Sequence, residues 1–289
     1  HLDAAARQRR CQRLLLNLGV LVGLGLLTKI YAYALLPIFS LVIVWSIWRT
    51  QRAWQGLAQG VRKTLWVILP ALALALPMWI RNLIIYPGWD FLALRWHDLV
   101  VRGQPTTASW IAEHGTLAYL ERAFGLTFRS FWGVFGWLST AMDERIYTAA
   151  ALFTGLLFLG LLWATVRWIT GAPDTDMDPF QVTVFAILGI LLRTVAASYL
   201  WYNIKFVQHQ GRYFFWGMLA IGTVVALGWR EVLHPLQGTI TGLLALALAG
   251  SMMATTAIGD DVNKWTLAMV LAVACFLLLQ PVLLIGTPM

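Results

Sequence analysis

The stretch QHQGRYFFW, residues 208–216, lies between two long apolar runs, and the rest of the sequence is arranged around it. It places a guanidinium, several amide groups and a cluster of aromatic rings where an apolar run begins. Arginine binds phosphate or carboxylate in a planar, two-pronged geometry that lysine cannot reproduce. Tyrosine, tryptophan and arginine also anchor helix ends at the headgroup level of a membrane. From this stretch alone, an anion site and an interfacial anchor are both open interpretations.

The composition indicates that lipid is the solvent for most of this chain. Hydrophobic residues make up 60% of the 289 residues, charged residues make up only 12%, and the mean hydropathy is +0.71. Soluble domains carry about 25% charged residues, so one globule could not hide this much apolar surface from water. The net charge of +8 comes from basic residues scattered at the ends of apolar runs. No basic stripe forms, which argues against a nucleic-acid partner.

Eight apolar runs are candidates for membrane-crossing helices, which need about 20 residues each. The sequence therefore predicts an all-α fold, a polytopic transmembrane helical bundle of about eight spans, as a single transmembrane domain over residues 1–289. One long polar stretch, residues 81–147, interrupts the runs. The predicted spans are Leu14–Leu27, Ile30–Trp48, Leu65–Ile80, Thr148–Trp168, Phe180–Leu200, Tyr213–Trp229, Leu236–Ile258 and Trp265–Ile285.

Small residues and hydrophobic periodicity predict local details of these helices. Gly19 and Gly23 have a spacing that lets two membrane helices approach closely. A polar break at Lys29 interrupts an apolar stretch too long for one span, so we expect a tight turn there. Pro37 should then kink the second span or lie in its first half. Apolar residues recur every three or four positions within residues 117–131, which predicts an amphipathic helix in the membrane interface.

The distribution of basic residues among the short loops predicts the orientation. Most of them lie on the same side as the N-terminus, which should therefore be cytoplasmic. The 81–147 loop with its interfacial helix, Lys29 and residues 208–216 then share the outer face. This arrangement would gather basic side chains from distant parts of the chain at one membrane surface.

Four of these basic residues, Lys29, Arg81, Arg129 and Arg212, stand at or near the ends of predicted spans or motifs on the outer face. Taken singly, each is more often an anchor whose charge reaches the membrane surface. Together they favour an anionic membrane lipid, such as a lipid phosphate, as a partner. Arg193 lies deeper, within a predicted span, where a charge costs about 2.5–3.5 kcal/mol. It should face other helices or water and have a partner.

Metal and cofactor sites receive little support from the sequence. His97, His114 and His209 have no metal-ligand spacing, and we assign no metal ligand and no cofactor. Asp143-Glu144 is a candidate for a divalent metal or a general base, although a charge pair at a helix N-terminus explains these two acids better.

Three motifs occur in order across roughly residues 14–229: GLGLLTK at 23–29, SFWGVFGW at 130–137 and QGRY at 210–213. The first, followed by an apolar segment with Pro37, resembles the polytopic glycosyltransferases of the GT-C class. That class includes the protein mannosyltransferases and aminoarabinose transferases. The other two motifs are similar to those of a poorly characterised bacterial branch grouped with the same class.

The resemblance implies a transferase of the bacterial plasma membrane that moves a sugar from a polyprenyl-phosphate donor to an acceptor at the outer face. It implies that Lys29, Arg81 and Arg212 lie near the donor phosphate, with Tyr213 beside them. Further residues should line the site, namely Arg129, Trp132, Trp137, His209 and Gln210. The class uses an acid in its first outer loop to take a proton from the acceptor. We expect that acid, and further helices, to precede His1.

Two other functions are open. A non-catalytic membrane subunit derived from such a fold would scaffold a larger complex through protein partners, and it would need no acidic outer loop. A transporter would need paired broken helices and internal repeats. Prolines do interrupt several runs, but the sequence has no visible repeat, so a transporter ranks below the other two.

Overall fold

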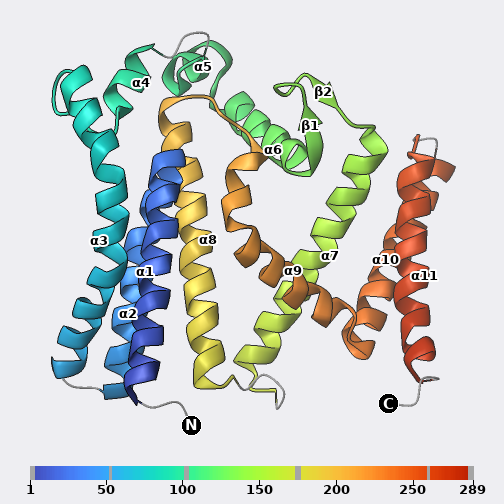
Figure 1. The fold of residues 1–289 in the computed structure, drawn as a ribbon. Helices are drawn as coiled ribbons and strands as arrows, with labels where there is room; N and C mark the ends of the chain where they lie inside the picture. The colour runs from blue at the N-terminus through green and yellow to red at the C-terminus, as the bar shows by residue number, and fades with distance from the viewer. Residues whose placement is uncertain (1–3, 52–53, 101–103, 173–176, 259–260, 286–289) are drawn as a thin grey trace. The chain divides into compact units, whose positions relative to one another are not determined.

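The computed structural model describes residues 4–51, 54–100, 104–172, 177–258 and 261–285, and these are mostly helical (Figure 1). Eight of the described helical segments are long and apolar enough to cross a membrane. Each of the eight predicted spans coincides with one of them. The prediction of an all-α, multi-pass integral membrane protein is therefore confirmed.

The chain divides into two compact units. The first comprises residues 1–106 and 200–207, and the second comprises residues 107–199 and 208–289. Short polar contacts tie the later segment of the first unit to the earlier one. Lys205 forms an ion pair with Asp98, and the backbone N–H of Val207 donates to the carbonyl of Pro105 at 3.1 Å.

The core of the first unit is the contact between its first and third long helices. A Cβ atom on Gly19 would lie 2.5 Å from the carbonyl oxygen of Val67, and one on Gly23 would lie 2.9 Å from Cα of Ala71. The two helices therefore run parallel and touch through their backbones, which confirms the close contact predicted from the glycine spacing. The helices of this unit are α1 (Ala4–Thr28), η1 (Ile30–Ala34), α2 (Leu35–Gln51), α3 (Trp54–Ile85) and α4 (Leu94–Val100).

The break between the first two spans lies where the sequence predicted it. Lys29 is extended, with φ −148° and ψ 137°, between α1 and η1. Pro37 is the third residue of α2, in the first turn, where its missing N–H leaves no helical hydrogen bond unmade. It therefore lies in the first half of the span.

α3 begins at Trp54, eleven residues before the predicted start of the third span at Leu65. The polar stretch before Leu65 is helical because its small residues form a contact face. A Cβ atom on Gly60 would lie 2.9 Å from Cα of Val44 in α2. Packing of this face extends the helix beyond its apolar part.

The second unit contains the remaining long helices and one short hairpin. Its elements are α5 (Thr107–His114), α6 (Thr116–Gly133), β1 (Val134–Phe135), β2 (Thr140–Ala141), α7 (Glu144–Ile169), most of α8 (Pro179–Lys205), η3 (Gly211–Gly217), α9 (Met218–Val232), α10 (Pro235–Ala257) and α11 (Lys264–Ile285). α7 and α9 cross at Gly160 and Gly228, where a Cβ atom on Gly160 would lie 1.9 Å from the carbonyl oxygen of Gly228. Only glycine allows this separation.

A buried carboxylate joins the same two helices near the end of α9. Glu231 is only 1% exposed. It accepts hydrogen bonds from Arg167 of α7 at 2.8 Å and from Arg230 at 2.9 Å. Two guanidinium groups therefore compensate the negative charge of Glu231, which burial has removed from water.

The polar stretch at residues 81–147 is shorter and more ordered than the sequence suggested. α3 continues to Ile85 and α7 begins at Glu144, so the stretch holds α4, α5, α6 and the β1–β2 hairpin. α6 is the predicted amphipathic helix. It exposes Leu117, Leu120 and Phe124 on one face, as a helix lying in a membrane interface does.

Candidate anion-binding site

The SFWGVFGW motif ends α6 and builds the β1–β2 hairpin. Val134 pairs with Ala141 and Phe135 with Thr140. The Tyr147 hydroxyl secures the base of the hairpin, since it donates to the carbonyl of Gly133 at 2.6 Å and accepts from the N–H of Met142 at 3.0 Å. The motif therefore forms a short, braced projection.

The hairpin turn is strained and holds a tryptophan outward. Gly136, Trp137 and Leu138 have φ values of +56°, +58° and +69°. Residues other than glycine rarely adopt this left-handed region, which costs of order 1 kcal/mol or more for each. The Trp137 side chain at this turn is 91% exposed. The turn is therefore less stable than an unstrained one, and it exposes the indole ring of Trp137.

The QHQGRYFFW stretch packs against the end of α6 through its glycine. A Cβ atom on Gly211 would lie 2.2 Å from the backbone nitrogen of Phe131. The N–H of Gly211 donates to Oγ of Ser130 at 2.8 Å. Gln208 braces the same stretch, because its Oε1 accepts from Nε2 of Gln210 and, at 3.2 Å, from the hydroxyl of Tyr213. The second and third motifs therefore pack against each other, and we call this contact the joint. Gln210 is buried in it and has a structural role.

Arg212 projects from this joint beside two aromatic rings. Its guanidinium carbon lies 5.7 Å from the ring centroid of Trp137 and 5.8 Å from that of Tyr213. The residue is exposed, and no Asp or Glu among the described residues forms an ion pair with it. Aromatic rings hold the guanidinium plane without using its N–H donors. The structure therefore brings together three predicted site residues, Arg212, Tyr213 and Trp137, and leaves the donors of Arg212 available to an anion.

Arg129 does not share this property. It forms a two-pronged ion pair with Glu144, at 2.8 and 2.9 Å, and its guanidinium also lies 5.0 Å from the ring centroid of Tyr147. Its charge is already matched, so it joins α6 to the start of α7. Trp132 has a similar structural role, since it packs edge-to-face on Phe131 and Phe153.

Lys29 and Arg81 belong to the first unit, and the parallel packing of α1 and α3 places them at the same end of that pair. Both are exposed. Arg81 donates to Oδ1 of Asn82 at 3.2 Å, and Asn82 in turn donates to the carbonyl of Phe91 at 2.9 Å. That Lys29, Arg81 and Arg212 serve one anion site stays a prediction.

His209 is a buried histidine without a hydrogen-bond partner. It is 1% exposed, and neither ring nitrogen is bonded to any described residue. The ring of Tyr119 meets it edge-to-face at 4.8 Å. Burial, together with the nearby positive charge of Arg122, lowers the pKa of His209 to about 4. His209 is therefore neutral at physiological pH.

This histidine makes the stability of the second unit depend on pH. Its pKa is lower in the folded state than the ordinary value of 6.5, so the folded state binds fewer protons than the unfolded state. The contribution is intact above pH 6.5 and is lost progressively as the pH falls toward 4. We expect the His209→Phe variant to lose less stability than the wild type over this interval, measured by thermal unfolding in detergent. A wild-type pH profile for His209→Phe would contradict this assignment.

Asp143 and Glu144 act at the N-terminus of α7, as the sequence favoured. The Asp143 carboxylate accepts from the N–H of Arg145 at 2.9 Å. Hydrogen bonds from the side chain and backbone of Arg145 hold the pKa of Asp143 below its usual value. Among the described ranges, no group of three or more His, Cys, Asp or Glu side chains could hold a metal ion.

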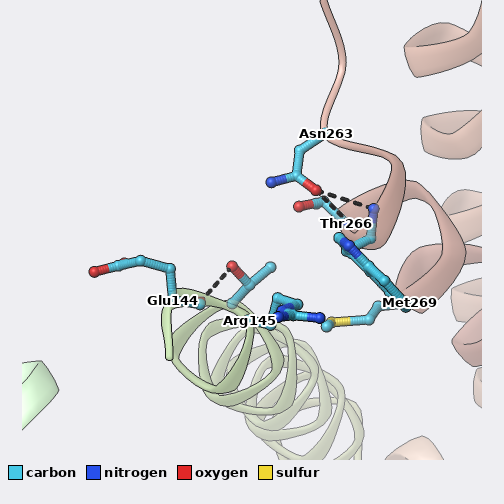
Figure 2. A pocket seen from close by; sticks show the side chains of 7 residues that line it. Glu144, Arg145, Asn263, Thr266 and Met269 are labelled. Atoms are coloured by element: carbon cyan, nitrogen blue, oxygen red, sulfur yellow. Dashed lines mark hydrogen bonds between the residues drawn. The ribbon is translucent and has the colours of Figure 1, made fainter. Parts of the chain in front are cut away.

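A small cleft lies next to this helix start. Glu144 and Arg145 of α7 line it together with Asn263, Thr266 and Met269 at the start of α11, and Figure 2 shows Arg145 extending toward Met269. Its volume is about 40 Å³, which is too small for a sugar. The guanidinium of Arg145 lies 5.0 Å from the ring centroid of Trp265. We interpret the cleft as a helix–helix contact.

Two residues that position the joint did not stand out in the sequence as site residues, although both lie in or beside the motifs. They are Ser130, which receives the N–H of Gly211, and Gln208, which braces Tyr213. Comparisons of the chain with protein-family models, curated proteins and solved structures find no match.

Proposed function

We propose that this chain forms the membrane portion of a glycosyltransferase of the GT-C type, which binds a polyprenyl-phosphate sugar at the outer face of the bacterial plasma membrane. The observation that carries the proposal is the state of Arg212. It is exposed and flanked by Trp137 and Tyr213, and no carboxylate in the described part of the chain neutralises it. The motif resemblance supplies the reaction class.

In this reaction the bond between the sugar and the donor phosphate oxygen breaks, and a bond forms between the sugar and a hydroxyl or amine of the acceptor. Arg212 stabilises the negative charge that grows on the departing phosphate, since its planar donors match two phosphate oxygens. A base takes the proton released by the acceptor, and the proposal assigns no base among these 289 residues. Trp137 and Tyr213 hold the guanidinium in place.

Phosphate binding by Arg212 can be tested on this chain by itself. The protein is reconstituted in lipid nanodiscs, and binding of undecaprenyl phosphate is measured by native mass spectrometry. Arg212→Ala should weaken binding by about tenfold or more, because it removes a charge-assisted, two-pronged contact. Arg212→Lys should recover part of the affinity, since lysine supplies the charge without the planar fork.

Arg62→Ala is the matched control, because Arg62 is an exposed arginine in the early part of α3 and belongs to none of the three motifs. It should bind like the wild type. Where sugar transfer can be assayed in membranes, Arg212→Ala should lower turnover by about 100-fold at equal expression. Wild-type binding and transfer by Arg212→Ala would reject the proposed role.

A further inference from the structure

Arg193 is an arginine in the middle of a membrane-spanning helix. It lies 14 residues after the start of α8 at Pro179 and 12 residues before its end at Lys205. At 1.5 Å per residue these are about 21 Å and 18 Å, so Arg193 stands at the centre of a bilayer whose apolar core is about 30 Å thick. Charged side chains at this depth are rare and are usually paired.

Among the described residues, no carboxylate lies in the middle of a candidate span, as Arg193 does. The sequence has 13 Asp and Glu residues, and each lies outside the interior of the eight candidate spans. The nearest cases are Glu144, the first residue of α7, and Glu231, in the last turn of α9. A second copy of the chain would be equally unable to supply a partner at the membrane centre.

The described residues of its own unit leave the Arg193 side chain uncovered. Arg193 is exposed, and it makes no hydrogen bond or ion pair with the described residues of its own unit. A Cβ atom placed on Gly189, one turn earlier, would meet only Nη1 of Arg193, at 3.8 Å. The side chain therefore folds back beside Gly189, as helical side chains lean toward the N-terminus.

The residues around Arg193 suit a helix rather than lipid chains. Ala186, Gly189 and Ala197 fall on the same face of α8 at helical spacing, and Ala186 and Ala197 are exposed. Small residues let a second helix backbone approach closely, which is how membrane helices associate. Close approach would bring a short acidic side chain of that second helix within reach of the guanidinium.

We propose that the face of α8 centred on Arg193 is the docking surface for a transmembrane helix of a partner protein, and that this helix carries an aspartate or glutamate near its midpoint. The positive charge of Arg193 favours an acidic partner, and the depth of Arg193 places that acid near the midpoint of the partner helix. The small residues beside Arg193 allow a helix to approach closely. This surface is independent of the lipid-phosphate site at Arg212.

The test uses a synthetic alanine–leucine transmembrane helix of about 24 residues with one central glutamate, and two matched peptides with glutamine or leucine there. The chain is reconstituted with each labelled peptide in liposomes, and association is measured by energy transfer. The glutamate peptide should associate about tenfold more tightly than the leucine peptide. Arg193→Leu should abolish the difference, and Gly189→Leu should reduce it by blocking close approach.

Charge reversal guards against a variant that merely misfolds. Arg193→Glu should lose its preferential association with the glutamate peptide and should instead associate with a peptide that has a central lysine. Arg212→Ala should keep the wild-type preference, and Arg193→Leu should keep undecaprenyl-phosphate binding, so the two proposals fail separately. Equal association of all peptides with the wild type would overturn the proposal, and a guanidinium that reaches out to lipid headgroups would give that result. An unchanged preference for the glutamate peptide in Arg193→Leu would also overturn it.

Discussion

Gly160→Ala should destabilise the second unit by about 1–3 kcal/mol, the usual cost of forcing an extra carbon into a well-packed contact. The added Cβ would fall 1.9 Å from the carbonyl oxygen of Gly228 and 2.9 Å from Cγ2 of Val232. The first of these is backbone, so side-chain rotation cannot make room and α7 and α9 must separate. The measurement is the free energy of unfolding in detergent, together with the spacing of spin labels on the two helices.

Gly155→Ala is the control within the same helix, because a Cβ atom there meets nothing within 4 Å. It should be neutral or slightly stabilising, since alanine favours a helix over glycine by about 0.5–1 kcal/mol. The two substitutions are chemically identical and should act in opposite directions. Equal stability of the two variants, with unchanged label spacing, would show that the α7–α9 crossing is looser than the structure has it.

Glu231→Leu should cost about 3–5 kcal/mol, the usual loss when one partner of a buried ion pair is removed. The variant removes this carboxylate from Arg167, whose side chain is only 15% exposed, and from Arg230, whose side chain is 60% exposed and can turn to water. The double variant Glu231→Leu, Arg167→Leu should recover much of the loss, since apolar replacement of both partners is often neutral.

Glu144→Ala is the matched control for a carboxylate with an arginine partner. Glu144 is 68% exposed where it pairs with Arg129, so its loss should cost no more than about 1 kcal/mol. Thermal unfolding of the four proteins in one detergent compares them directly. A loss in Glu231→Leu no larger than that in Glu144→Ala would mean that the buried pair contributes little to the α7–α9 contact.

The membrane fold could be predicted because its cause is local. Each span is a run of apolar residues, and all eight runs coincide with helices. The contact made by Gly19 and Gly23 was also predictable, since the glycine spacing is visible in the sequence. The start of α3 was missed because its cause is not local: the residues before Leu65 are polar, and packing of Gly60 on α2 makes them helical.

The candidate site was predictable only in part. The motifs indicated the residues, and the structure brings Arg212, Tyr213 and Trp137 together. The structure also shows that Arg129 forms an ion pair with Glu144. This pairing depends on how the hairpin folds α6 back toward α7. The left-handed turn at Trp137 and Leu138 has no sequence signal, because both residues ordinarily avoid that backbone conformation. Burial of His209 likewise depends on a contact with Tyr119, ninety positions earlier in the chain.

The length of α3 makes it a gauge of membrane thickness. Lys63 and Arg81 stand 18 residues apart on this single helix, a separation of about 27 Å along its axis. The apolar core of a typical bilayer is about 30 Å thick, so the two charges bracket it with their side chains reaching outward. A thinner bilayer would be met by tilting α3, and α1 would have to tilt with it, because the two are joined backbone to backbone at Gly19 and Gly23. A change in membrane thickness, which the lipid composition sets, would therefore tilt α1 and α3 together as one rigid pair.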